Sequence, residues 1–545
     1  MVSWMGCLSF VLSSFTLTDH LPSDSITFVE GHNGSDLPVF RENGYMIGRM
    51  DDVPYVLYTE KVNQDNVFGK YYLIDYQKDC STPHPFQLLR EDDGQYRLVT
   101  QNIDSRVSFS LSVDPVSFSG TFTTTDNPAT KHRVAFQDYS APKYEEYASF
   151  RYLKPIFSYT KIPDVLYGKA TGYWTSYPMD HDSRIGKMLF TLMPKTAKPT
   201  EQDLLMDFYL PQDDSLAKRP LMVLLHGGSF YFSDKGDHAI RTACEHYAQL
   251  GYVVASVNYR MGFKFKKKSI QQCGYQAVQD AHAALRFLMA NAEEYRIDPD
   301  FVFLAGSSAG SIIALSVAFM NDQNCPPFVA ENKLVEKCGL LHTSGNEYRN
   351  EVKIRALANL WGAVYDLHEL DGHNIPVISF HGTDDKIVPF HYGYPFSNYK
   401  RIGEDLFDVM YGSQAIHEYL DSLHVRNELH PLEGCDHAPH EDKDGTLNKH
   451  YYYILDHTER FFYSELEARP TLQNDEHDPA LYRLEETNIS CLSWQIEGGL
   501  ILENKDRQVR VIWFDDAQNH TLRASGISAI GTPFKQEWKI KNRCS

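Results

Sequence analysis

Two hydrophobic patterns alternate along the chain. Residues 20–145 and 469–545 carry short runs in which apolar and polar side chains alternate, with Gly, Asp and Asn between the runs. Such runs predict antiparallel strands that bury one face. Residues 146–468 instead carry continuous apolar runs separated by segments of helical spacing. We therefore predict an α/β fold with a mostly parallel sheet, flanked by an N-terminal and a C-terminal all-β domain.

Helical spacing predicts two long helices in the central segment. The first covers residues 237–250 and precedes an apolar strand at 252–257. The second covers residues 276–295, where apolar side chains recur every three or four positions, at Val278, Ala281, Leu285 and Leu288. The basic run at 264–268 is expected in a loop, with its charges in solvent.

A strand-to-helix turn provides a candidate nucleophile. The apolar run 301–304 is followed by Gly306-Ser307-Ser308-Ala309-Gly310 and then by the helical segment 311–320. A G-x-S-x-G sequence in this position is typical of a nucleophile elbow, in which a tight turn exposes the central serine. We predict Ser308 as the nucleophile. The alternative is an ordinary glycine-rich turn between a strand and a helix.

Three further segments surround this motif in the order that a Ser–His–Asp hydrolase requires. Before it, the strand-like run 219–225 ends in His-Gly-Gly-Ser-Phe at 226–230. After it, the strand-like run 375–380 ends in His-Gly-Thr-Asp-Asp at 381–385, and His437 follows a further strand-like segment. Ser, Asp and His in this order are typical of an α/β-hydrolase.

On these motifs, residues of about 150–465 resemble the carboxylesterase/lipase branch of the α/β-hydrolases. The resemblance implies that Ser308 attacks the ester, that His437 is its general base, and that Asp385 holds the His437 tautomer. It also implies an oxyanion hole formed by backbone N–H groups of Gly228, Ser229 and Ala309, with Gly227 allowing the turn. Many members have a third glycine where this chain has Ser229, whose side chain could narrow the pocket.

Alternatives remain for two of these roles. Asp384 is the alternative acid, and the H-G-x-x-D pattern of the family favours Asp385. His440 and His381 are the alternatives to His437. His440 lacks the preceding glycine-containing turn, and His381 ends a strand directly, so a structural part is expected for it. His226 is likewise expected to brace the oxyanion loop.

Charge and composition narrow the function further. The chain has 545 residues and a formal net charge of −20, which argues against nucleic acid and anionic membrane surfaces as partners. No C-x-x-C or histidine-rich pattern suggests a metal, and no cofactor is expected. Among the nine cysteines, Cys325 and Cys338 could close a small loop.

The N-terminal segment suggests export. Residues 1–19 contain an apolar stretch similar to the core of a signal peptide, although the positive n-region and a clear cleavage site are missing. No other run is long and apolar enough to predict a transmembrane span. We expect a secreted, periplasmic or cell-surface protein.

Three regions lie outside these motifs. Residues 20–145 are expected to be a spacer domain or a glycan-binding module. Residues 469–545, with W-x-x-x-G-G and V-x-V-x-W, resemble a PKD-type immunoglobulin-like domain, which implies surface attachment through β-domains. The aromatic-rich insertion 386–412 is expected either to line an aryl or sugar pocket or to pack on itself as a small cap.

The sequence therefore predicts a serine carboxylic-ester hydrolase that acts through an acyl-enzyme on a small-molecule or glycan-linked ester, for example a feruloyl or acetyl ester. A peptidase of the prolyl-oligopeptidase type shares the triad, but residues 20–145 are too few for a propeller. A non-enzymatic surface-binding protein on the same fold would not need all three triad residues.

Overall fold

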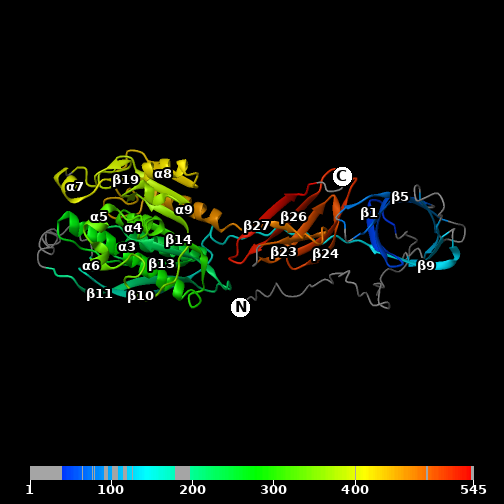
Figure 1. Cartoon of the computed structure of the whole chain (residues 1–545), viewed down its shortest axis with the longest axis horizontal. Helices are drawn as coiled ribbons and strands as arrows, with labels where there is room; N and C mark the ends of the chain where they lie inside the picture. Colours follow the sequence, from blue (N-terminus) through cyan, green and yellow to red (C-terminus); the bar gives the residue numbers. More distant parts are fainter. Residues whose placement is uncertain are drawn as a thin grey trace. The chain divides into compact units, whose positions relative to one another are not determined.

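The computed structural model describes residues 40–541 except 64–65, 76–77, 79, 91–95, 101–108, 114–118, 125–126, 178–196, 399 and 486–488. The chain divides into two compact units (Figure 1). The first contains Met1–Ala148, Ala468–Ser528 and Pro533–Ser545, and the second contains Ser149–Glu467 and Ala529–Thr532. The predicted signal segment lies outside the described residues. In the part of the chain that is described, no helix is long and apolar enough to cross a membrane.

An eight-stranded sheet forms the centre of the second unit, in the order β10-β11-β13-β12-β14-β15-β17-β20. The β11 strand pairs antiparallel with its neighbours β10 and β13, and the remaining neighbours are parallel. The sheet is thus mostly parallel, as predicted for an α/β-hydrolase. Its strands are β10 (Tyr159–Gly172), β11 (Thr200–Pro211), β12 (Arg219–Leu225), β13 (Val253–Val257), β14 (Ile297–Ser307), β15 (Ile354–Leu360), β17 (Val377–Gly382) and β20 (Asn427–Leu432).

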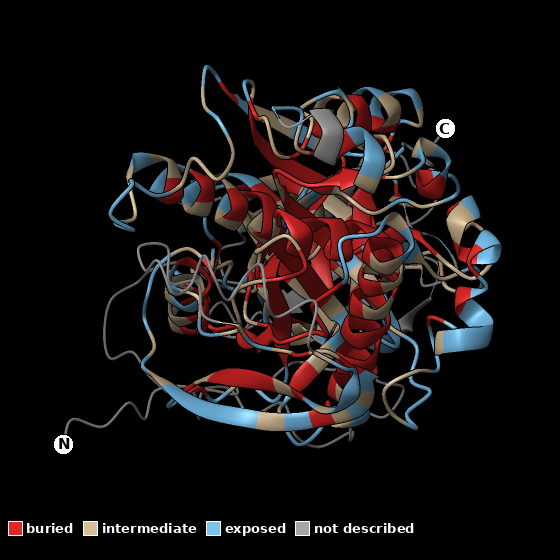
Figure 2. Ribbon diagram, turned by 90° about the vertical axis from the view of Figure 1, so that its left-hand side faces the viewer, coloured by how far each residue is buried: buried red, intermediate tan, exposed pale blue. Residues whose placement is uncertain are grey.

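Helices cover both faces of this sheet, which explains the continuous apolar runs in its strands. In β12, Leu221 and Val223 belong to one apolar cluster while Met222 and Leu224 belong to another. Figure 2 shows that the buried residues are concentrated in the sheet and in the helix faces turned toward it. The helices are α2 (His238–Leu250), α3 (Lys267–Ala290), α4 (Ala309–Phe319), α5 (Pro327–Glu331), α6 (Leu334–Cys338), η1 (Leu367–Leu370), α7 (Lys400–Leu406), α8 (Ser413–Ser422) and α9 (Lys449–Leu466).

The α3 helix differs from its prediction at both ends. It begins at Lys267 rather than at 276 and ends at Ala290 rather than at 295. Lys267 and Lys268 of the basic run therefore lie in its first turn, not in a loop. A salt bridge of 2.7 Å between Lys267 Nζ and Asp408 Oδ1 holds this turn. Because Asp408 is far away in the sequence, the local pattern could not reveal this contact.

The loop-closing disulfide suggested for Cys325 and Cys338 is absent, and both are free thiols. The residues between them form α5 and α6. The Cys325 Sγ lies 3.0 Å from the Asn321 carbonyl oxygen. The prediction was wrong because the segment between the cysteines packs as two short helices and does not need a covalent closure.

The insertion at 386–412 contains α7, β18 (Tyr392–Gly393) and β19 (Met410–Gly412), and the two strands pair in a small sheet with β16 (Ala363–Val364). Phe396 packs against Phe407 with ring centroids 5.1 Å apart, whereas Tyr392 and Tyr394 are exposed. Part of this insertion therefore packs on itself, as one of its two interpretations predicted, and part presents aromatic rings to solvent.

Four residues late in the sequence belong to the second unit. Ile530 is buried in the apolar cluster that contains Phe461 and Phe462. Its carbonyl oxygen accepts a hydrogen bond of 2.7 Å from the Tyr152 hydroxyl. The Thr532 hydroxyl donates to the Leu466 carbonyl oxygen at 2.8 Å. The core around the end of α9 is therefore completed by a segment distant in sequence.

The first unit consists of β-strands from both flanks of the chain. The N-terminal strands form one antiparallel sheet in the order β6-β5-β3-β2-β1-β9-β8-β7. These are β1 (Gly44–Met50), β2 (Val53–Val62), β3 (Asn66–Leu73), β5 (His84–Arg90), β6 (Tyr96–Thr100), β7 (Phe109–Val113), β8 (Ser119–Thr124) and β9 (Asn127–Asp138). The strand prediction for this region agrees with the structure.

The C-terminal strands form two further sheets, β21-β22-β25-β24 and β23-β26-β27, around Trp494 and Trp513. The short β4 (Cys80–Ser81) pairs with β25, so the two flanks share a sheet. The likeness to a PKD-type domain stays a prediction. These strands are β21 (Leu472–Asn474), β22 (Leu481–Leu484), β23 (Ile489–Glu497), β24 (Gly499–Lys505), β25 (Gln508–Phe514), β26 (Thr521–Ser528) and β27 (Pro533–Lys539).

Candidate active site

Ser308 occupies the sharp turn between β14 and α4. Its φ of 54° lies in the left-handed region, which is uncommon for a residue with a side chain. A Cβ on Gly306 would lie 2.3 Å from the Gly310 carbonyl oxygen, and a Cβ on Gly310 would lie 2.2 Å from the Leu225 carbonyl oxygen. Only glycine fits at these two positions. The small residues of the motif are therefore required by the close approach of the backbone.

The structure brings the three predicted catalytic side chains together. Ser308 Oγ lies 2.9 Å from His437 Nε2, and His437 Nδ1 lies 2.7 Å from Asp385 Oδ2. The three residues follow β14, β20 and β17, whose carboxyl ends meet at one edge of the parallel sheet. This geometry allows His437 to accept the Ser308 proton while Asp385 holds the opposite ring nitrogen.

Asp385 is held as a buried carboxylate. Its Oδ1 accepts hydrogen bonds from the backbone N–H groups of Ile387 at 2.8 Å and Val388 at 2.9 Å. Burial acts to raise the pKa of Asp385, but hydrogen bonds from His381 and His437 outweigh it and hold the pKa well below its usual range. Asp384, the alternative acid, is exposed, and its backbone N–H donates to the Cys435 carbonyl oxygen at 3.0 Å.

The two alternative bases take other positions. His440 stacks on Trp361 with ring centroids 4.9 Å apart, and burial lowers the pKa of His440 to about 4. His381 Nε2 lies 3.1 Å from Asp385 Oδ2, and its Nδ1 lies 2.8 Å from Ser413 Oγ. His381 therefore contacts the same carboxylate oxygen as His437 and is anchored in the core.

The predicted oxyanion loop lies against the nucleophile turn. Gly228, Ser229 and Phe230 have positive φ values of 107°, 55° and 58°. A Cβ on Gly227 would lie 3.4 Å from the Ser308 Cβ, which shows how closely the loop approaches. Ala309 is the first residue of α4, so its N–H is among those that a helix leaves without an internal acceptor. The loop and the helix start thus provide backbone donors beside Ser308.

His226 supports this loop from the protein interior. It is fully buried, its ring stacks on Tyr259 at 4.4 Å, and its Nδ1 lies 2.8 Å from the Gly227 carbonyl oxygen. The Tyr259 hydroxyl donates to the His226 carbonyl oxygen at 2.7 Å. Burial lowers the pKa of His226, so the neutral ring is favoured. These contacts agree with the bracing role expected for His226.

A buried ion pair fixes the segment after β13, and its role was not assigned from the sequence. The Arg260 guanidinium donates to Asp280 on α3 through Nε at 2.9 Å and Nη2 at 2.7 Å, and the Arg260 backbone N–H donates to the same carboxylate at 2.7 Å. Neither residue is more than 3% exposed.

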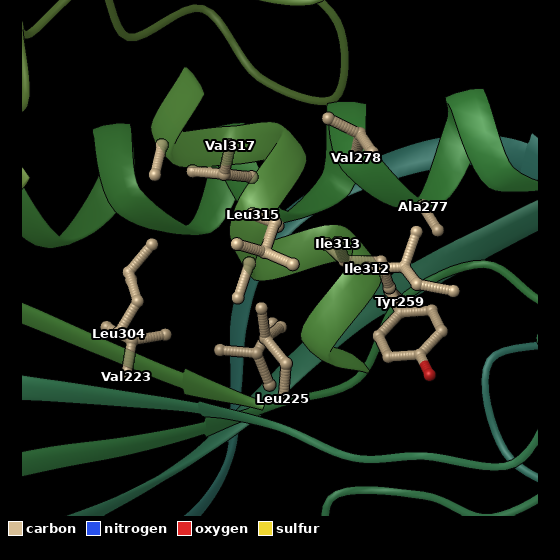
Figure 3. Close-up of a cluster of buried hydrophobic side chains, with 14 of the residues drawn as sticks. Val223, Leu225, Tyr259, Ala277, Val278, Leu304, Ile312, Ile313, Leu315 and Val317 are labelled. Carbon is tan, nitrogen blue, oxygen red and sulfur yellow. The ribbon is translucent and has the colours of Figure 1, made fainter. Parts of the chain in front are cut away.

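A small pocket, lined mostly by apolar side chains, lies between α3, α4 and α5. Val278 on α3 and Ile312 on α4, both labelled in Figure 3, line it. The Ile312 N–H donates to the Ser308 carbonyl oxygen at 3.0 Å, so the pocket begins one helical turn from the nucleophile. The lining residues are Phe230, Gly274, Tyr275, Val278, Ile312, Ser316, Met320, Pro326, Phe328, Val329 and Tyr365.

This pocket could not be predicted from the hydrophobic pattern. Gly274 was the one residue in the sequence that pointed to it, because a glycine in the interior of a helix costs stability and usually has a packing or functional reason. Within the described ranges, no group of three or more His, Cys, Asp or Glu side chains is arranged to hold a metal ion.

Parts of the chain are similar to known esterases. Residues 206–375 match the protein family described as BD-FAE. Gut esterase 1 of Caenorhabditis elegans is 32% identical over 96 residues, which are 17% of either chain. The para-nitrobenzyl esterase of Bacillus subtilis is 32% identical over 152 residues, 27% of this chain and 30% of that protein. The matches thus cover less than a third of the length of either relative.

Two further likenesses are of interest. The neuroligin-like protein glit-1 of Caenorhabditis elegans is 33% identical over 101 residues, 18% of this chain and 13% of that protein. Among solved structures, the apo form of Thermogutta terrifontis esterase 2 is 21% identical, with a TM-score of 0.35, and the likeness covers 49% of this chain and 92% of that one.

Proposed function

We propose that this protein is a serine carboxylic-ester hydrolase that acts through an acyl-enzyme. One observation carries the proposal: Ser308, His437 and Asp385 form an unbroken hydrogen-bonded series with distances of 2.9 and 2.7 Å. The similarity to esterases supports the same reaction class. A protein that only binds a partner does not require this side-chain series.

The chemistry follows from the positions of the groups. His437 Nε2 accepts the Ser308 proton as Oγ attacks the ester carbonyl carbon, and the backbone N–H groups of Gly228, Ser229 and Ala309 stabilise the oxyanion. The His437 imidazolium, held by Asp385, then protonates the leaving alcohol. Water attacks the acyl-enzyme by the reverse route and releases the acid.

The pocket beside Ile312 suggests an apolar acyl group. Its lining is largely hydrocarbon and aromatic, and Ser316, Tyr275 and Tyr365 are the hydroxyl-bearing residues among the lining residues. We assign the acyl side of the ester to this pocket. Feruloyl and acetyl esters of glycans remain within this class, and export and surface attachment through the β-strand regions stay proposals from the sequence.

The test is hydrolysis of p-nitrophenyl acetate and butyrate by the wild type and by Ser308→Ala. Ser307→Ala is the matched control, because it alters the neighbouring hydroxyl in the same turn. We expect turnover that collapses only in Ser308→Ala, and a fluorophosphonate probe that adds its mass to Ser308. Equal rates in the wild type and in Ser308→Ala, or cleavage of aminoacyl-proline amides in preference to esters, would contradict the proposal.

A further inference from the structure

The triad acid is shared by two imidazole rings. Asp385 Oδ2 faces His437 Nδ1 at 2.7 Å and His381 Nε2 at 3.1 Å. The side chains of Asp385 and His381 are both fully inaccessible to solvent. A triad uses one histidine on its acid, so the second ring has no part in the proton transfers described above. The contacts of its other ring nitrogen, Nδ1, indicate the role of His381.

The opposite nitrogen of His381 belongs to a buried chain of hydrogen bonds. His381 Nδ1 lies 2.8 Å from Ser413 Oγ at the start of α8, and Asn359 Nδ2 lies 3.0 Å from the same oxygen. Asn359 Nδ2 also lies 3.0 Å from Ser379 Oγ. Asn359 and Ser413 are fully buried, and Ser379 is nearly so.

The backbone N–H of Gly362 fixes the orientation of the Asn359 side-chain amide. The Gly362 N–H can only donate, and it lies 2.9 Å from Asn359 Oδ1, so this atom is the amide oxygen. The two N–H bonds of Asn359 are then used by Ser413 and Ser379. His381 Nε2 faces two groups that can only accept, the Asp385 carboxylate and the Val388 carbonyl oxygen, so it carries the ring proton. In this tautomer Nδ1 accepts the hydroxyl proton of Ser413, whose oxygen accepts from Asn359.

With that tautomer, His381 donates to the triad acid. The Nε2–H is directed at Asp385 Oδ2, with the Val388 carbonyl oxygen as a second acceptor at 3.2 Å. The chain also reaches the nucleophile helix, because the Ser311 hydroxyl donates to Asn359 Oδ1 at 2.6 Å and the Ser311 N–H donates to the Ser308 carbonyl oxygen at 3.0 Å. The acid and the nucleophile are thus attached to one buried polar network.

We propose that His381 is a positioning residue for Asp385, and that Ser413 and Asn359 fix the direction in which it donates. The proposal rests on the proposed function, since Asp385 is its triad acid. The His381 N–H holds Oδ2 in place and takes up part of its charge. Asp385 therefore holds the His437 imidazolium less tightly than it would with a single partner.

The groups that affect His437 are few. Asp385 faces its Nδ1, the Asp436 carboxylate accepts its backbone N–H at 2.8 Å, and His440 lies on the same loop with Asp237 near it. The charged group that faces His381 is Asp385. Removing the His381 donor changes one contact in this set, so a shift in the titration of His437 can be assigned to it.

Two serines on the same asparagine give a matched experiment. Ser413→Ala and Ser379→Ala each remove one acceptor of Asn359 Nδ2 at a buried site, but only Ser413 touches His381. We expect Ser413→Ala to lower kcat about fivefold with KM unchanged, and to move the acid limb of the kcat/KM profile upward by about half a pH unit. Ser379→Ala should leave the acid limb in place.

Substitution of His381 tests the donor directly. We expect His381→Leu to lower kcat about tenfold and to shift the acid limb in the same direction. His381→Gln places an amide N–H near the lost Nε2–H and should restore most of the rate. Equal acid limbs in Ser413→Ala and Ser379→Ala, or no rescue by glutamine in a folded protein, would overturn the proposal.

A measurement without substrate separates this proposal from the proposed function. Histidine NMR, assigned with His437→Gln, reports the pKa of His437 in each serine variant. If the pKa rises in Ser413→Ala and not in Ser379→Ala, the positioning role stands even when no ester is hydrolysed. If neither variant shifts it while ester turnover is normal, the positioning role fails and the esterase proposal stands.

Discussion

Replacing Gly274 by a larger residue is expected to shorten the acyl chain that the protein accepts. Gly274 lines the pocket from α3, and a Cβ built on it meets nothing closer than the Tyr365 hydroxyl, 4.0 Å away. Alanine therefore fits without strain, and leucine would extend into the space assigned to the acyl group. Each methylene that loses its place in the pocket costs about 0.8 kcal/mol, or about fourfold in kcat/KM.

The alanine and leucine substitutions of Gly274 have separate expected effects on stability and on the preferred acyl length. Gly274→Ala removes a glycine from a helix interior and should raise the unfolding free energy by up to about 1 kcal/mol. It should also lower kcat/KM about fourfold for the longest ester accepted, with acetate unaffected. Gly274→Leu should remove most of the preference for butyrate or hexanoate over acetate. A loss of activity caused by unfolding would not produce this combination.

The assay is a p-nitrophenyl ester series from acetate to hexanoate, with thermal unfolding measured on the same samples. Gln272→Leu is the matched control, because it places the same side chain on the same helix at a position that does not line the pocket. If Gly274→Leu keeps the wild-type ratio of hexanoate to acetate turnover, the pocket does not hold the acyl group and the assignment is refuted.

Two further predictions concern buried charge. Asp280→Asn should lower the unfolding free energy by about 3–5 kcal/mol in urea titrations, because it leaves the Arg260 guanidinium buried without its charged partner, and a loss below about 1 kcal/mol would contradict this. Burial raises the pKa of Glu369 from 4.5 to about 8. Between these pH values the Glu369 carboxyl is ionised in the unfolded protein and protonated in the folded protein. The unfolding free energy therefore falls as the pH rises through this range. Glu369→Gln should reduce the difference in unfolding free energy between pH 5 and 8 by on the order of 3 kcal/mol, and an unchanged difference would contradict this.

The parts of the site that local patterns determine could be predicted from the sequence. Ser308, Asp385 and His437 each follow a strand, and a parallel sheet brings the carboxyl ends of its strands to one edge. Three motifs far apart in sequence were therefore expected to meet. The choice of Asp385 over Asp384 depended on family resemblance, and the structure supplies the physical reason: Asp384 is exposed, whereas Asp385 is buried against two rings.

The parts that depend on packing between elements could not be predicted. Asn359 is a lone polar residue in the buried run of β15, which signals a specific partner but does not identify it. Its partners come from α4, β17 and α8, and no spacing rule connects these elements. The start of α3 was missed for the same reason, because Lys267 is held in the helix by Asp408 rather than by its sequence neighbours.

The order of synthesis gives the burial of Ile530 a further consequence. A ribosome completes Leu466 some 60 residues before it adds Ile530, at roughly 5–20 residues per second. For several seconds the apolar side chains around Phe461 and Phe462 have therefore been synthesised, but Ile530, which packs against them, has not. During that interval we expect the nascent chain to expose apolar surface of the kind that chaperones bind. A chain that stops after α9 would keep this surface uncovered permanently, so solubility is expected to depend on residues far from the catalytic serine.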